Sequence, residues 1–187
     1  MTNFLNESKA EASLSKWVNS VAANYARELI EEFGQPDVIT KSMVLWHDNR
    51  IHEFKRVYVK DEYIPHAKPR PHYDFVYSTM DFHVPENLMG AIAASSESII
   101  IDQLKDEVTA RCGDIFANAI TLGFVQKVAL GKIKPEDAPA EYEKHILEGI
   151  LPSWFPDPRK QDNMNENIIK LSKNNIRSLI KSMINGL

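Results

Sequence analysis

The chain has 187 residues, 43% of them hydrophobic and 26% charged, with a formal net charge of -4. This composition is typical of a globular domain, and no apolar run approaches the roughly 18–20 residues that a membrane span requires. The lone cysteine, Cys112, excludes an internal disulfide and fits a reducing compartment, so we expect a cytoplasmic protein. Residues 1–13 include acidic side chains and lack an apolar stretch, which predicts no secretory leader or transit peptide.

The charge is unevenly distributed along the chain. Residues 168–187 carry +4, which leaves -8 for residues 1–167. An acidic body argues against binding to nucleic acid, because affinity for phosphate backbones comes mainly from clustered lysine and arginine.

The first predicted elements are a helix, a hairpin and a strand. Residues 8–33 have apolar side chains at helical spacing, followed by Gly34 as a stop signal. Residues 38–59 are rich in β-branched and aromatic residues on both sides of a polar turn, which predicts a hairpin. The three prolines in residues 60–72 predict an extended loop or edge segment. Residues 73–84 alternate in the manner of a strand.

The remaining elements complete the fold class. Residues 85–97 predict a short helix, residues 98–112 a second hairpin, and residues 114–131 and 135–149 two further helices. This order predicts an α+β fold, with an antiparallel sheet of about four to five strands and helices packed on one face.

We expect residues 1–150 to form one α+β domain, followed by a Pro/Asn-rich linker over 151–167 and an amphipathic basic helix over 168–187. That helix has an apolar stripe that must be buried somewhere, so it predicts contact with a second copy or another protein, or packing on its own domain. The stripe lacks aromatic residues, which argues against a membrane surface. The partner-binding residues expected are Ile169, Ile176, Leu179, Ile180, Met183 and Ile184.

Histidine is concentrated in one part of the sequence, residues 47–83, together with several aspartates. Imidazole and carboxylate groups bind transition metals and transfer protons near neutral pH. Three imidazoles and a carboxylate complete a mononuclear zinc or iron site, and two imidazoles with one carboxylate suffice for the facial-triad type. The alternative is that these histidines are separate structural residues, since their spacing matches no established motif. The candidate metal ligands are His47, His66, His72, Asp74 and His83.

Candidate catalytic residues are drawn from the same segment and from the cysteine. His47, His72 and Asp74 can act in acid–base chemistry, and Cys112 can act as a nucleophile if a cation lowers its pKa. The alternative for Cys112 is a buried packing role, which we expect. Three aromatic residues of the 73–84 strand, Tyr73, Phe75 and Tyr77, predict either a binding surface or a core face under a helix.

Three sequence segments, VLWHDN, PHAKPRPHYDF and IIIDQLKDEVTARCGDIFANAITLGFVQKVALGK, resemble a family of uncharacterised bacterial proteins. The family pattern is W-H-[DN]-N, P-H, P-H-x-D and A-R-C, and the similarity covers residues 38–132. This chain has Asp48 in place of an asparagine and Gly113 in place of an acidic residue. The resemblance implies no reaction. It singles out Trp46, His47, His66, His72, Asp74, Arg111 and Cys112.

Two classes of function are consistent with these patterns. The first is a protein with a His/Asp pocket that binds a metal or performs acid–base chemistry. The second is a non-enzymatic subunit of a complex or virion that associates through residues 168–187. Convergence of the imidazoles in space distinguishes the first class from the second.

Overall fold

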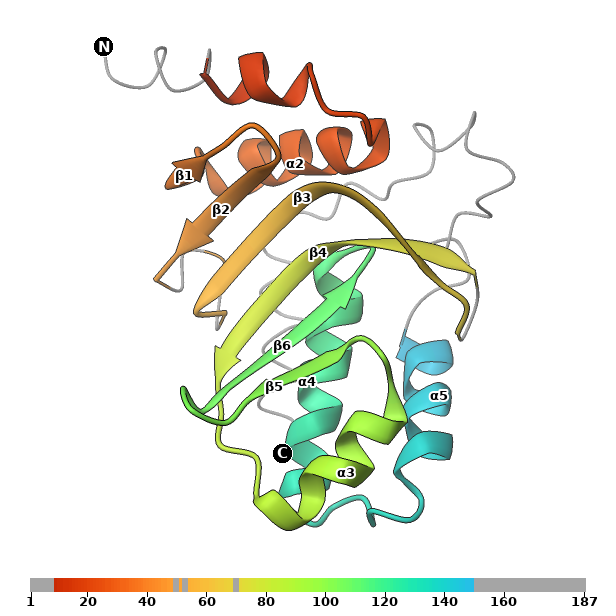
Figure 1. Ribbon diagram of the computed structural model, residues 1–187. Helices are drawn as coiled ribbons and strands as arrows, with labels where there is room; N and C mark the ends of the chain where they lie inside the picture. Colours follow the sequence, from red (N-terminus) through yellow and green to blue (C-terminus); the bar gives the residue numbers. More distant parts are fainter. Residues whose placement is uncertain (1–8, 49–50, 52–53, 69–70, 150–187) are drawn as a thin grey trace.

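The computed structural model describes residues 9–48, 51, 54–68 and 71–149. Six strands form one antiparallel sheet in the order β1-β2-β3-β4-β6-β5 (Figure 1). The strands are β1 (Val38–Ile39), β2 (Met43–His47), β3 (Arg56–His66), β4 (His72–Asp81), β5 (Ile99–Asp102) and β6 (Glu107–Cys112). The helices are α2 (Ser20–Phe33), α3 (Glu86–Ser95), α4 (Ile115–Ala129) and α5 (Ala138–Gly149).

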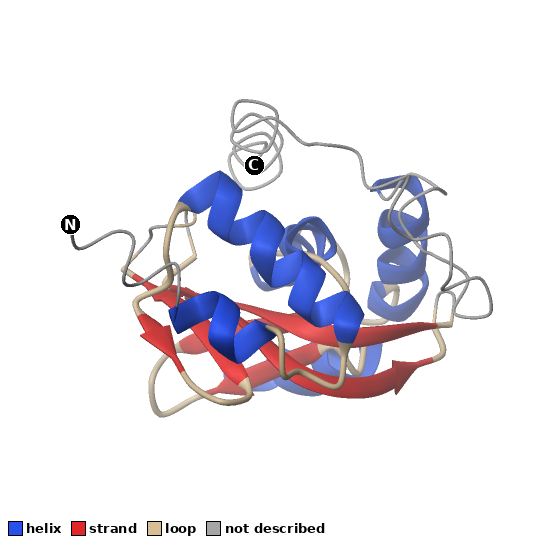
Figure 2. Ribbon diagram, turned by 90° about the horizontal axis from the view of Figure 1, so that it is seen from above, coloured by secondary structure: helices blue, strands red, loops and turns tan. Residues whose placement is uncertain are grey.

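Helices α2 and α4 lie on the same face of the sheet (Figure 2). Helix α2 packs against β3, whereas α4 packs against β4 and β6 and is flanked by α3 and α5. The α+β class is confirmed. The sheet has six strands rather than four or five because residues 38–47 turn back on themselves. Thr40 N donates a 2.8 Å hydrogen bond to Met43 O, and this turn separates β1 from β2.

The Pro-rich segment 60–72 was expected to be a loop or an edge, and most of it is strand. β3 continues to His66, and β4 begins at His72. Beyond Lys60, β3 no longer pairs with β2, so within the described residues Pro65 has a neighbouring strand, β4, on one side alone. An edge tolerates proline because its missing N–H is not required by a neighbouring strand.

The single helix expected over residues 8–33 is interrupted. A helical segment covers residues 9–14, and α2 starts only after Asn19. Asn19 Oδ1 accepts a hydrogen bond from Ala22 N, which caps α2, and the Asp61 carboxylate accepts hydrogen bonds from Val18 N and Asn19 N. These bonds satisfy backbone groups that a continuous helix would have bonded internally.

Helix α4 forms the centre of the core. Its N-cap is Asp114, with Oδ1 accepting hydrogen bonds from Phe116 N and Ala117 N. The helix is buried almost all round because the sheet covers one side and α5 another. In the described part of the chain, no helix is long and apolar enough to cross a membrane. The linker 151–167 and the helix 168–187 expected from the sequence lie outside the described residues.

Candidate metal centre at the β3–β4 hairpin

Two histidines come together where β3 ends and β4 begins, next to the turn of the β3–β4 hairpin. His66 and His72 are directly opposite each other in the antiparallel register, and their ring centroids are 4.8 Å apart. Asp74 follows on β4, opposite Ile64. Directly opposite residues have Cβ atoms about 4.5–5.5 Å apart, so the register brings the two imidazoles together, and Asp74, two positions along β4 from His72, lies on the same face of the strand.

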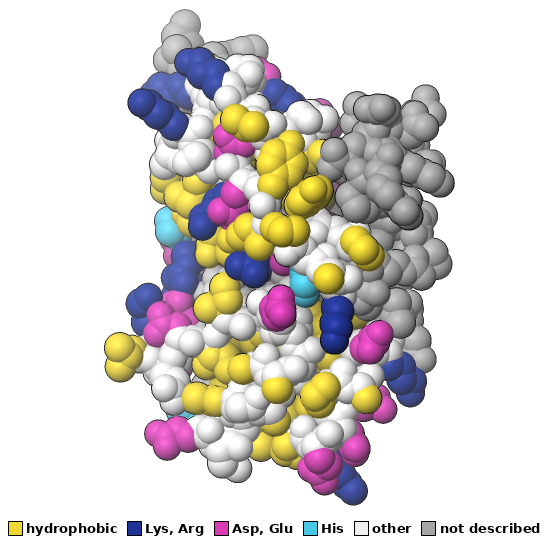
Figure 3. Space-filling model, turned by 45° about the vertical axis from the view of Figure 1, so that its right-hand side comes forward, with side chains coloured by type: hydrophobic (Ala, Val, Ile, Leu, Met, Phe, Trp, Pro, Cys, Tyr) yellow, Lys and Arg dark blue, Asp and Glu magenta, His cyan; other side chains and the backbone are white. Residues whose placement is uncertain are grey.

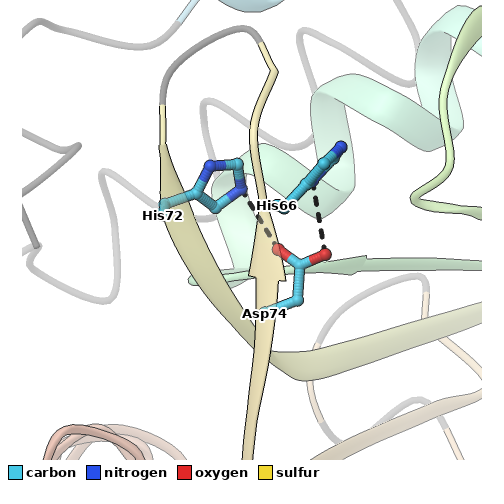
Figure 4. A group of neighbouring side chains, drawn as sticks. All are labelled: His66, His72 and Asp74. Carbon is cyan, nitrogen blue, oxygen red and sulfur yellow. Dashed lines mark ion pairs between the residues drawn. The ribbon is translucent and has the colours of Figure 1, made fainter.

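The two histidines converge on the carboxylate of Asp74 (Figure 4). His66 Nδ1 lies 3.3 Å from Asp74 Oδ2, and His72 Nε2 lies 3.1 Å from Asp74 Oδ1. One donor atom from each residue lies within 4.8 Å of the other two. Two imidazoles and a carboxylate form a donor set suited to a divalent transition metal.

This cluster is enclosed by the protein. Asp74 is fully buried, and His72 and His66 are only 7% and 9% exposed. On the face seen in Figure 3, histidine contributes only small areas, while acidic and basic side chains are interspersed. Burial raises the pKa of the Asp74 carboxyl, but the interactions with His66 and His72 outweigh it and hold this pKa below its ordinary value.

One oxygen of the buried carboxylate is not fully satisfied. Among the described residues, Asp74 Oδ1 receives no well-aligned hydrogen bond, although His72 Nε2 is close. The other oxygen, Oδ2, has Arg111 Nε at 3.4 Å in addition to His66. A buried anionic oxygen without a hydrogen bond is costly, so Oδ1 is the atom that gains most from a bound cation.

Two neighbouring side chains complete the surroundings. Ser98 Oγ lies 3.1 Å from His66 Nδ1, and Cys112 Sγ lies 3.4 Å from His72 Nε2. Burial, with Asp114 and Asp74 nearby, raises the pKa of the Cys112 thiol well above its ordinary value. A protonated thiol is a poor nucleophile, which argues against the catalytic role considered for it. No motif in the sequence marked Ser98.

His47 and His83 do not join the cluster. His47 is opposite Arg56 on β3, and Arg56 is opposite Thr79 on β4. His72 lies at the other end of β4, about 23 Å from that row at about 3.3 Å per residue. His83 follows the end of β4 at Asp81, is exposed, and pairs with Asp106. Both are therefore removed from the candidate ligand set, which keeps His66, His72 and Asp74.

The aromatic residues of β4 do not form a continuous exposed surface. Phe75 belongs to the core and contacts Tyr25 of α2 edge-on, and Tyr77 is 4% exposed and stacked on Tyr58. Tyr73 packs edge-on against Tyr63. The packing alternative is the one that the structure supports.

Comparison with known proteins adds no family to this description: no family model, curated protein or solved structure matches the chain. The resemblance to a bacterial family stays a prediction. Most of the residues that it singles out do meet at this site, namely His66, His72, Asp74, Arg111 and Cys112.

Proposed function

We propose that this protein binds a divalent transition metal ion, Zn2+ or Fe2+, through His66, His72 and Asp74. The observation that carries the proposal is the convergence of two buried imidazoles on the buried carboxylate of Asp74, whose Oδ1 lacks an aligned hydrogen bond. A cation at this position would satisfy Asp74 Oδ1 and accept the lone pairs of both imidazoles.

The distances between donors support this function. Zinc lies about 2.0–2.1 Å from imidazole nitrogen and about 2.0–2.2 Å from carboxylate oxygen, so adjacent donors of a tetrahedral site are about 3.3–3.5 Å apart. His72 Nε2 lies 3.1 Å from Asp74 Oδ1, and one donor atom from each of the three residues lies within 4.8 Å of the other two. Small side-chain shifts are enough to open a site of the required size.

The energies also favour the ion. Binding through His66 Nδ1 displaces the hydrogen bond that this atom shares with Ser98, worth about 1 kcal/mol, and its contact with Asp74 Oδ2, worth about 1.5–3 kcal/mol. Structural zinc binding contributes roughly 10–16 kcal/mol in small zinc domains. Arg111 lies beside Oδ2, so Oδ1 is left for the metal.

The enclosure of the site favours ion binding over the acid–base alternative. A metal ion needs only a small space, whereas a general acid or base must come within hydrogen-bond reach of a substrate atom. All three side chains are at most 9% exposed. The alternative of an interaction subunit rests on residues 168–187, which lie outside the described part of the chain, so it stays a prediction.

Metal analysis of the full chain, purified without an affinity tag, tests the proposal. We expect about one equivalent of zinc or iron, or, after treatment with a chelator, uptake of about one equivalent measured by titration calorimetry. His72→Ala should weaken binding by more than the roughly 10–100-fold typical of losing an outer-shell partner.

His83→Ala is the matched control, because it removes an exposed histidine that also contacts an aspartate. The proposal is overturned if the wild-type chain takes up no zinc, iron or cobalt, or if His83→Ala weakens binding as much as His72→Ala does.

A further inference from the structure

The cysteine lies at the edge of the proposed metal centre. Cys112 is the last residue of β6 and is opposite Val76, two positions along β4 from Asp74. Its Sγ is 3.4 Å from His72 Nε2, and the side chain is buried. The sulfur therefore approaches the same nitrogen that approaches Asp74 Oδ1.

The distance between Cys112 Sγ and His72 Nε2 fits two ligands of one metal ion. Zinc lies about 2.3 Å from thiolate sulfur and about 2.0–2.1 Å from imidazole nitrogen, so the two donors are about 3.6 Å apart in a tetrahedral site. We infer that Cys112 is the fourth ligand, which makes the centre a closed zinc site of two histidines, one aspartate and one cysteine. This inference rests on the proposed function, since it assigns a ligand to that same ion.

Charge balance supports the fourth ligand. A divalent ion held by neutral imidazoles and one carboxylate leaves a net charge of about +1 in a buried place, and the Arg111 guanidinium adds a further positive charge beside it. A thiolate cancels the charge of the zinc–carboxylate unit. On binding, the zinc–sulfur bond forms, the thiol proton passes to solvent, and no group is oxidised or reduced.

The unsatisfied oxygen of Asp74 is a second observation at the same place, separate from the position of the cysteine. Asp74 is 0% exposed, and its Oδ1 lacks an aligned hydrogen bond among the described residues. A ligand set that includes sulfur favours zinc over magnesium or calcium, and four protein ligands leave no position for a substrate. The ion would then join the β3–β4 hairpin to β6 and stabilise the fold rather than catalyse a reaction.

Cobalt titration of the full, chelator-treated chain tests the fourth ligand directly. The chain has one cysteine, so a thiolate-to-cobalt charge-transfer band in the near ultraviolet identifies Cys112 as a ligand. We expect this band in the wild type and its loss in Cys112→Ser, with at least about a tenfold lower affinity. Val108→Ala, a buried change on the same strand without a donor atom, should keep the band.

X-ray absorption of the zinc-loaded wild type needs no variant and therefore holds even if Cys112→Ser fails to fold. We expect one sulfur scatterer at about 2.3 Å beside nitrogen and oxygen at about 2.0–2.2 Å. Metal bound without a sulfur scatterer or a charge-transfer band overturns the inference and leaves the proposed function standing. Failure to bind any metal overturns both.

Discussion

Histidine contacts aspartate at two places in the described structure, one exposed to solvent and the other buried. His83 Nδ1 lies 2.7 Å from Asp106 Oδ1, with the two side chains 69% and 62% exposed. His66 and His72 are 3.3 and 3.1 Å from a carboxylate, that of Asp74, which is fully buried. The exposed pair has the shorter contact, so distance alone does not identify the site that holds a ligand.

The two places differ in how well water solvates and screens the charged groups. Solvent screens an exposed pair and hydrates both partners, so such a pair contributes about 0–1 kcal/mol. A buried carboxylate has lost its hydration and depends on the groups around it. Only the buried cluster has both a need for a cation and the donors to hold one.

The largest expected effect comes from removing the buried charge. Asp74→Asn removes the anionic partner of His66, His72 and Arg111, and breaking a buried pair of this kind costs roughly 3–5 kcal/mol. We expect that loss in the free energy of unfolding, measured by urea denaturation, together with loss of metal binding.

The matched control is Asp106→Asn, at the exposed pair. It should change the free energy of unfolding by no more than about 0.5 kcal/mol. If the two variants were destabilised equally, burial would not be what distinguishes the two associations.

The sequence predicted the concentration of histidines but not which of them would meet. His66 and His72 are placed opposite each other by the register of one hairpin. Because of its prolines, segment 60–72 was expected to be an extended loop or an edge segment, with no partner strand assigned to it. The strand persists because Pro65 lies beyond the end of β2, a relation between distant segments that no local pattern reveals.

The fold class was more predictable than element boundaries. The helical period of residues 8–33 was correct for α2, but the break before it depends on Asp61, which is far away in the sequence. Local signals fixed the start of α4, because Asp114 caps it with its own side chain. Features set by neighbouring residues were therefore found, and features set by tertiary contacts were missed.

The second expected effect is stabilisation by metal. A ligand that binds only the folded state adds about 2.7 kcal/mol at a free concentration of 100 times its dissociation constant. We expect zinc to raise the melting temperature of the chelator-treated wild type and to leave that of His72→Ala nearly unchanged. An equal shift in both proteins would place the ion elsewhere.

A third carboxylate, that of Glu107, is buried like that of Asp74 but has different partners. It therefore separates the effect of burial on stability from the effect of the partner's side-chain type. Glu107 has a 5% exposed side chain and pairs with Arg56 and Lys55 rather than with imidazoles. The hydrogen bonds from Arg56 lower the pKa of Glu107 to about 2, burial opposes this, and Lys55 adds to it. We expect Glu107→Gln to cost about 2 kcal/mol at neutral pH, as for hydrogen bonds to charged groups.

The pH dependence of that cost has a definite sign. The pKa of Glu107 is depressed on folding from an ordinary value of 4.5, so its stabilisation is fully present above about pH 4.5 and is lost as the pH falls toward about 2. The difference between wild type and Glu107→Gln should shrink over that range, measured by urea denaturation in the presence of a chelator. A difference that stays constant down to pH 2 would contradict the assignment.

The smallest expected effect is at the exposed histidine. His83→Ala removes an imidazole that pairs with Asp106, at a place where both side chains are more than 60% exposed. Screening by water and salt limits the loss to about 0.5 kcal/mol, and adding salt should reduce it further. Urea denaturation at low and high salt measures this difference, and metal titration of the same variant should match the wild type. A loss of metal affinity in His83→Ala would show that the exposed His83–Asp106 pair contributes to metal binding. Burial would then not explain the difference between this pair and the cluster of His66, His72 and Asp74.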